Sequence, residues 1–155
     1  MGYRLAFMLA DLLHPERVRT GLILPDKEAA LRAVASLLTM PEGEVNEEVV
    51  YDVLVDRERL ASTGIGSAVA IPHGRYDGME ELRAAVAICP GGVDFDAVDQ
   101  LPVKILVGII GPKSMPQKHL AALAGVSRLL RMDAKREQLL RAVDRTEAYR
   151  ALTES

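Results

Sequence analysis

The sequence predicts a single α/β (α+β) domain in which a small mixed sheet is flanked by helices. Apolar residues recur at helical spacing in the first third of the chain and again after Gln117, whereas the middle carries short apolar runs bounded by Gly and Pro. Helices on both sides of a group of strands are expected to pack against the sheet. The 155 residues suffice for one domain with a buried core, and no repeat or long linker divides them, so residues 1–155 are expected to form one unit.

Two helices are predicted before residue 60. In the first, apolar residues follow the i, i+3, i+4, i+7 spacing of one face: Leu31, Val34, Ala35 and Leu38. Asp26 can cap its N-terminus and Pro41 marks its end. The second is predicted to begin at Asn46, because Glu47 and Glu48 then lie in the first turn, where the helix dipole favours negative charge. Four residues share or border its inner face: Val50, Val53, Leu54 and Arg57.

From Ser62 onward, short apolar runs bounded by Gly and Pro replace the helical spacing. Residues 62–66 contain two glycines and predict a turn, and the apolar run 68–71 is too short for a helix and suits a buried strand ending at Pro72. Residues 84–89 and 103–110 are two further predicted strands, each bounded by Gly or Pro.

Helical spacing returns from Gln117 onward. One side of the first C-terminal helix is expected to carry Leu120, Leu123, Ala124 and Ser127. Another helix is suggested by Leu139, Leu140 and Val143, and Thr146 is expected to cap a last short one ending near Leu152.

Composition narrows the possible classes of function. The net charge of −3 gives no strong attraction to nucleic acid or to an anionic membrane, and no stretch is long enough to span a bilayer. Cys89 is the only cysteine, which excludes an intrachain disulfide, and it is expected to be buried. The apolar run 5–13 is interrupted by Asp11 and followed by His14 without a cleavage site, so a cytoplasmic protein is expected.

His73 is the strongest candidate for chemistry. A predicted strand delivers it, Pro72 fixes the backbone before it, and Gly74 after it allows conformations closed to other residues. Imidazole suits phosphoryl transfer, because one ring nitrogen attacks while a hydrogen bond to the other fixes the tautomer. An anionic phosphate also needs donors, which backbone N–H groups beside glycine can supply, and we expect Thr63, Gly64 and Gly74 to bind it.

The other two histidines differ in setting. His119 is predicted near the start of a helix, close to unpaired backbone N–H groups where anions bind, although a surface role is equally open. His14 lies at an expected element boundary, which favours a surface or packing role. A metal site is not expected, because no cysteine or suitably spaced carboxylate joins the histidines.

The sequence lacks the motifs of several other classes of enzyme and binding protein. The chain has no Gly-rich loop ending in Lys-Ser or Lys-Thr and no Gly-x-Ser-x-Gly elbow, which argues against a nucleotide-binding P-loop and a hydrolase of that type. The sequence has neither a stripe of basic residues nor aromatic residues interleaved with them, so a nucleic-acid-binding role is not expected.

Residues 62–74, Ser-Thr-Gly-Ile-Gly-Ser-Ala-Val-Ala-Ile-Pro-His-Gly, resemble the signature of the enzyme IIA domains of the bacterial phosphotransferase system, in the fructose–mannitol–nitrogen group. Arg57-Glu58 upstream, residues 94–99 before the last strand and residues 119–124 after it support the resemblance, which covers roughly residues 5–152 in the family's order.

The resemblance implies a phosphohistidine carrier without a cofactor. His73 matches the phosphorylated position, His119 the second active-site histidine that hydrogen-bonds the phosphoryl group, and Arg57 a basic residue nearby. Phosphate would arrive from the histidine-phosphorylated carrier protein (HPr or its nitrogen-branch equivalent). It would leave to a cysteine on an enzyme IIB domain, or stay on a protein that acts on a regulated partner.

Two questions stay open within the resemblance. A nitrogen-type regulatory role is favoured over fructose or mannitol uptake, because nothing in the chain resembles an attached B or membrane C domain. A docking module that keeps the fold without carrying phosphate is the contrasting hypothesis. Ala68 departs from the glycine usual in the family, and its methyl group is expected to alter strand packing or to narrow the approach of a phosphate donor.

Overall fold

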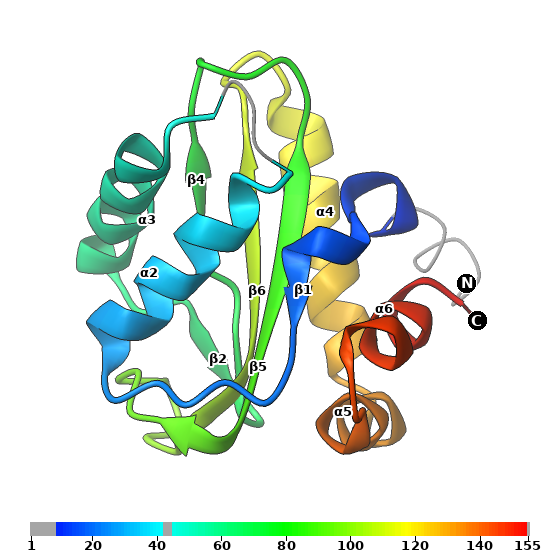
Figure 1. Ribbon diagram of the computed structural model, residues 1–155. Coiled ribbons are helices and arrows are strands. Elements are labelled where there is room, and N and C mark those ends of the chain that lie inside the picture. The colour runs from blue at the N-terminus through cyan, green and yellow to red at the C-terminus, as the bar shows by residue number, and fades with distance from the viewer. Residues whose placement is uncertain (1–8, 42–44, 155) are drawn as a thin grey trace.

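A computed structural model describes residues 9–41 and 45–154 and confirms the predicted class, a mixed sheet between two layers of helices (Figure 1). The strands are β1 (Val18–Arg19), β2 (Gly64–Gly66), β3 (Val69–Ala70), β4 (His73–Arg75), β5 (Arg83–Val93) and β6 (Val103–Gly111). Their order is β1-β5-β6-β3-β2, and β4 also pairs with β6. The long β5 and β6 are antiparallel, whereas β3 and β4 run parallel to β6, one after the other along the same edge.

Helices cover both faces of the sheet. Residues 9–12 are helical, and the further helical elements are the 3₁₀ helix η1 (Pro15–Arg17), α2 (Lys27–Leu38), α3 (Glu47–Leu60), α4 (Pro116–Leu130), α5 (Asp133–Arg141) and α6 (Arg145–Thr153). Helices α2 and α3 lie on one face, and α4, α5 and α6 lie on the other (Figure 1). Two apolar layers result: one joins Leu38 and Leu54 to Leu106, and the other joins Val126 and Leu152 to Ile109. None of the described helices combines the length and apolarity that crossing a bilayer requires.

The two N-terminal helices form as predicted. The Asp26 carboxylate accepts the N–H of Ala29 at 2.8 Å, and the Asn46 side chain accepts the N–H of Val49 at 3.2 Å, so each cap pairs a donor that the helix itself cannot. Helix α2 can approach β6 closely because residue 108 is glycine: a Cβ there would lie 2.2 Å from Cγ1 of Val34. Cys89 is buried as expected, and His14 caps η1 by accepting the Glu16 N–H.

The predicted turn at residues 62–66 is wrong. Gly64–Gly66 form β2, which pairs with β3 in an antiparallel hairpin, and the turn falls on Ser67 and Ala68. Both turn residues have positive φ, 57° and 67°, as a two-residue hairpin loop of type I′ requires. The strand predicted over residues 68–71 shortens to β3, and Ala68 lies outside it. The expectation that its methyl group alters strand packing is therefore wrong, because the methyl group bears on a turn.

Ala68→Gly is expected to stabilise the protein. A left-handed conformation is unfavourable for alanine and open to glycine, so relieving it at φ 67° should raise the free energy of unfolding by about 0.5–1 kcal/mol. Urea denaturation checks this, with Ala61→Gly as the control at a residue with negative φ. An Ala68→Gly variant less stable than the parent would show that this turn is not strained.

The C-terminal helices confirm one detail of the sequence predictions and correct two. Leu120, Leu123, Ala124 and Ser127 share one side of α4 as predicted, but the side facing the core carries His119, Ala122, Val126 and Leu129, and Leu120 is 67% exposed. Helix α5 ends at Arg141, so Val143 lies beyond it and is exposed. The cap of α6 is Asp144, which accepts the N–H of Glu147, and not Thr146; the helix ends at Thr153.

Candidate functional site

His73 begins β4 and is half-buried. Its Nδ1 lies 2.7 Å from the carbonyl oxygen of Ile71. Because a carbonyl oxygen only accepts hydrogen bonds, Nδ1 must carry the proton and donate. In the neutral ring the lone pair therefore lies on Nε2. This one backbone contact therefore makes Nε2 the nucleophilic nitrogen of the neutral ring.

The surroundings of His73 keep its ring neutral. Burial lowers the pKa of His73 most, and the positive charges of Arg57 and Arg75 lower it further. The hydrogen bond to Ile71 and the negative charge of Glu58 act in the opposite direction, and the net shift is downward. A neutral imidazole is the nucleophilic form, so the site favours attack by Nε2 near pH 7.

His119 lies beside His73, as the predicted pairing requires. The two ring centroids are 5.8 Å apart at an interplanar angle of 58°. His119 is only 3% exposed, and its Nδ1 is buried with no partner among the described residues. Since an orphaned N–H donor is costly to bury, the proton belongs on Nε2. Its own backbone N–H is bonded to the Met115 carbonyl, and no side chain in the described part of the protein caps the first turn of α4.

Two arginines add positive charge to the cavity that His73 and His119 line, which has a volume of about 470 Å³. Arg57, as predicted, reaches it from α3, and its guanidinium donates to the carbonyl of Ala61 at 2.9 Å. Arg75 was not among the candidates, although it lies two residues after His73 on the same strand and therefore on the same side. Two guanidinium groups and a neutral imidazole N–H form a site suited to a dianion such as a phosphoryl group.

The rim of this cavity is apolar. Leu60 and Leu120, both lining it, are 81% and 67% exposed, and Leu123 lies beside them. A second cavity of about 380 Å³ shares His73, Leu120 and Leu123 and extends to Ile65, which is 46% exposed. Exposed leucines around a polar centre are typical of surfaces that contact another protein.

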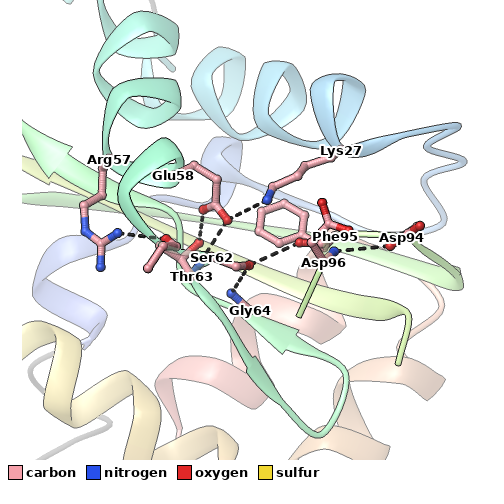
Figure 2. Close-up of polar contacts among 10 residues, drawn as sticks. Lys27, Arg57, Glu58, Ser62, Thr63, Gly64, Asp94, Phe95 and Asp96 are labelled. Carbon is pink, nitrogen blue, oxygen red and sulfur yellow. Dashed lines mark hydrogen bonds and ion pairs between the residues drawn. The ribbon is translucent and has the colours of Figure 1, made fainter. Parts of the chain in front are cut away.

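The predicted phosphate-binding residues already have other contacts. The N–H and hydroxyl of Thr63 both donate to the carboxylate of Glu58, at 2.9 and 2.5 Å, and the N–H of Gly64 donates to the Ser62 hydroxyl (Figure 2). Their N–H donors are therefore engaged within the protein. Whether Thr63, Gly64 and Gly74 bind phosphate stays a prediction.

Gly74 has a packing role that its sequence context does not reveal. The carbonyl of Pro72 and the N–H of Tyr76 both bond to β6, so the alternation of a parallel pair turns the backbone of Gly74 toward β6 as well. A Cβ at residue 74 would lie 2.3 Å from Cγ1 of Val53. Glycine at this position therefore lets α3 approach β4, which brings Arg57 to the cavity.

The buried ring of His119 should make stability depend on pH. Burial first, and then the charges of His73 and Arg75, lower the pKa of His119 to about 4, whereas the unfolded chain has an ordinary histidine. The unfolded state therefore binds the extra proton between pH 6.5 and 4, and stability falls as the pH falls through this window. We expect the parent to lose about 2 kcal/mol more than His119→Gln between pH 7 and 4.5, with partial solvent screening taken into account.

Chemical denaturation at the two pH values measures this loss. His14→Gln is the matched control at a histidine outside the cavity. Equal pH dependence in the parent and in His119→Gln would mean that His119 titrates normally in the folded protein.

Comparisons with known proteins agree on one family. Residues 11–155 match the family described as "Phosphoenolpyruvate-dependent sugar phosphotransferase system, EIIA 2". A "Nitrogen regulatory protein" of Bradyrhizobium diazoefficiens is 33% identical over 144 residues, 93% of this chain and 94% of the relative. A "PTS system fructose-specific EIIA component" of Haloferax volcanii is 34% identical over 129 residues, 83% of each chain.

A solved structure supports the same relationship. The crystal structure of the nitrogen regulatory protein IIA-Ntr from Neisseria meningitidis superposes with a TM-score of 0.87 at 27% identity, covering 94% of this chain and 99% of that one. The sheet and both helical layers are thus similar to those of a known protein.

Proposed function

Because the chain belongs to the EIIA 2 family of the phosphoenolpyruvate-dependent sugar phosphotransferase system, we propose that it carries phosphate on Nε2 of His73. One observation supports this most directly: the Ile71 carbonyl holds the Nδ1 proton, which places the lone pair on Nε2 of a ring that lines the charged cavity. The proposal includes residues 1–155 acting as one phosphocarrier domain in the cytoplasm.

The transfer is a displacement between two imidazoles. The Nε2 lone pair attacks the phosphorus of a phosphohistidine on the carrier protein; the new N–P bond forms as the old one breaks, and the carrier's imidazole takes the bonding pair. It leaves neutral when its second nitrogen holds a proton. His73 keeps its Nδ1 proton, so the hydrogen bond to the Ile71 carbonyl stabilises the positive charge that develops on the ring.

The neighbouring residues stabilise the transferred group. His119 would donate its Nε2–H to a phosphoryl oxygen, while Arg57 and Arg75 offset the charge of the dianion. For Thr63, Gly64 and Gly74 we propose that they shape the phosphate-binding site: Thr63 is held by Glu58, Gly64 is bonded to Ser62, and the absence of a side chain at residue 74 leaves room for Val53.

The apolar rim suits a protein donor and not a free metabolite. Leu60, Leu120 and Ile65 surround His73 and would be covered when a phosphorylated carrier docks. We propose a nitrogen-type regulatory role, supported by the likeness to nitrogen regulatory proteins over nearly their full length. Fructose- or mannitol-type uptake, with an enzyme IIB domain as acceptor, is the second candidate, favoured by the similarity to the fructose-specific component.

Intact mass tests the proposal. The purified protein is incubated with phosphoenolpyruvate, enzyme I and the carrier protein, and its mass is measured before and after mild acid. We expect a gain of one phosphoryl group that acid removes. No gain with the cognate upstream proteins would contradict the carrier role and favour the docking module, for which partner capture would be the next experiment.

A further inference from the structure

The carboxylate of Glu58 is buried beside the site but does not line its cavity. Its side chain is 5% exposed, at the end of α3 and next to Arg57. One oxygen accepts the Thr63 N–H and lies 2.9 Å from Nζ of Lys27; the other accepts the Thr63 hydroxyl (Figure 2). Burying a carboxylate is costly unless it is paired. Here its partners are the N–H and hydroxyl of Thr63 and the ammonium group of Lys27.

Backbone contacts connect this carboxylate to the reactive ring. The carbonyl of Thr63 accepts the N–H of Ile71 at 2.9 Å, and the carbonyl of Ile71 accepts Nδ1–H of His73 at 2.7 Å. Glu58 therefore holds both donors of Thr63, Thr63 holds the N–H of Ile71, and Ile71 orients the His73 imidazole. Each contact is a direct hydrogen bond, and the path crosses the β2–β3 hairpin, whose register shifts between Gly64 and Gly66.

Lys27 secures the distal end of this path. Its ammonium group lies 4.7 Å from the centroid of the Phe95 ring and balances the charge of Glu58, and its side chain is 26% exposed. Lys27 and the Thr63 N–H share one carboxylate oxygen, whereas the Thr63 hydroxyl contacts the other.

We infer that Glu58 is a positioning residue, which holds the His73 imidazole in the Nδ1–H tautomer through Thr63 and Ile71. The inference rests on the proposed function for its effect on transfer, but the tautomer itself is a property of the unphosphorylated protein. Removing the carboxylate should loosen Thr63 and Ile71, weaken the Nδ1 hydrogen bond and let the ring sample the other tautomer, which cannot attack through Nε2.

Nitrogen-15 NMR of the His73 ring tests the inference without phosphate. In Glu58→Leu we expect the two ring nitrogens to shift toward tautomer-averaged values, and phosphate uptake to fall about tenfold. Glu58→Gln keeps one acceptor oxygen and should lie between Leu and the parent. Lys27→Met removes the ion pair and the contact with the Phe95 ring but leaves both Thr63 donors on the carboxylate, so it should lower stability while the ring signals and the uptake rate stay as in the parent.

The matched control is Glu48→Gln. This substitution removes an exposed carboxylate of the same helix, one that forms an ion pair with Arg32. The inference is overturned if the ring signals of folded Glu58→Gln match the parent, or if Lys27→Met shifts them as far as the Glu58 variants do. Because these signals need no upstream proteins, failure of the parent to take up phosphate would contradict the proposed function and leave this result standing.

Discussion

His73→Gln is expected to lose phosphate uptake by at least about 1,000-fold, because no other side chain in the cavity offers a suitably placed lone pair. Glutamine keeps an amide donor for the Ile71 carbonyl but has no nucleophilic nitrogen. The side chain is only half-buried, so the free energy of unfolding should change by less than about 1 kcal/mol. The measurement is the rate of phosphoryl incorporation from the phosphorylated carrier protein, followed by intact mass.

Its control is His14→Gln, since His14 caps η1 and lies outside the cavity. That variant should incorporate phosphate at the parental rate. Incorporation by His73→Gln at the parental rate would show that the nucleophile had been assigned to the wrong residue.

His119→Ala is expected to separate the two halves of the reaction. Nε2 of His73 remains available, so some phosphate uptake should persist. Onward transfer should slow by about 100-fold, because the buried donor beside the phosphoryl group is gone while its charge must still be stabilised as the N–P bond breaks. Single-turnover transfer to the downstream acceptor, begun from isolated phosphorylated protein, measures this step.

A second substitution at the same position shows whether the donor matters. Glutamine can place an N–H near the position of the imidazole Nε2, so His119→Gln should recover part of the rate that alanine loses. If alanine and glutamine transferred equally fast, His119 would act by packing and not by donating a hydrogen bond.

The helix boundaries could be predicted where capping residues and periodicity agree. Asp26 and Asn46 each precede an amphipathic run, and each accepts the expected N–H. In helix α4 the predicted apolar side is correct but is not the side that meets the core: Leu120 and Leu123 border the His73 cavity, whereas the buried side includes His119. Periodicity finds an apolar face but does not show whether that face meets the core or a partner.

The residues of the candidate site could be predicted only in part from the sequence. His73, His119 and Arg57 stand far apart in sequence, and the structure brings them to one cavity. Arg75 could have been found from its i+2 relation to His73 on a strand. The engagement of Thr63 by Glu58 could not, because it depends on how the end of α3 meets the following loop, and no local pattern encodes that contact.

The central claim is that the Ile71 carbonyl directs phosphate to Nε2 of His73. Phosphorus–nitrogen couplings in the phosphorylated, nitrogen-15-labelled protein test it most directly. The structure predicts a single coupling, to Nε2 of His73, with the proton retained on Nδ1. Coupling to Nδ1 of His73, or to any nitrogen of His119, would contradict it.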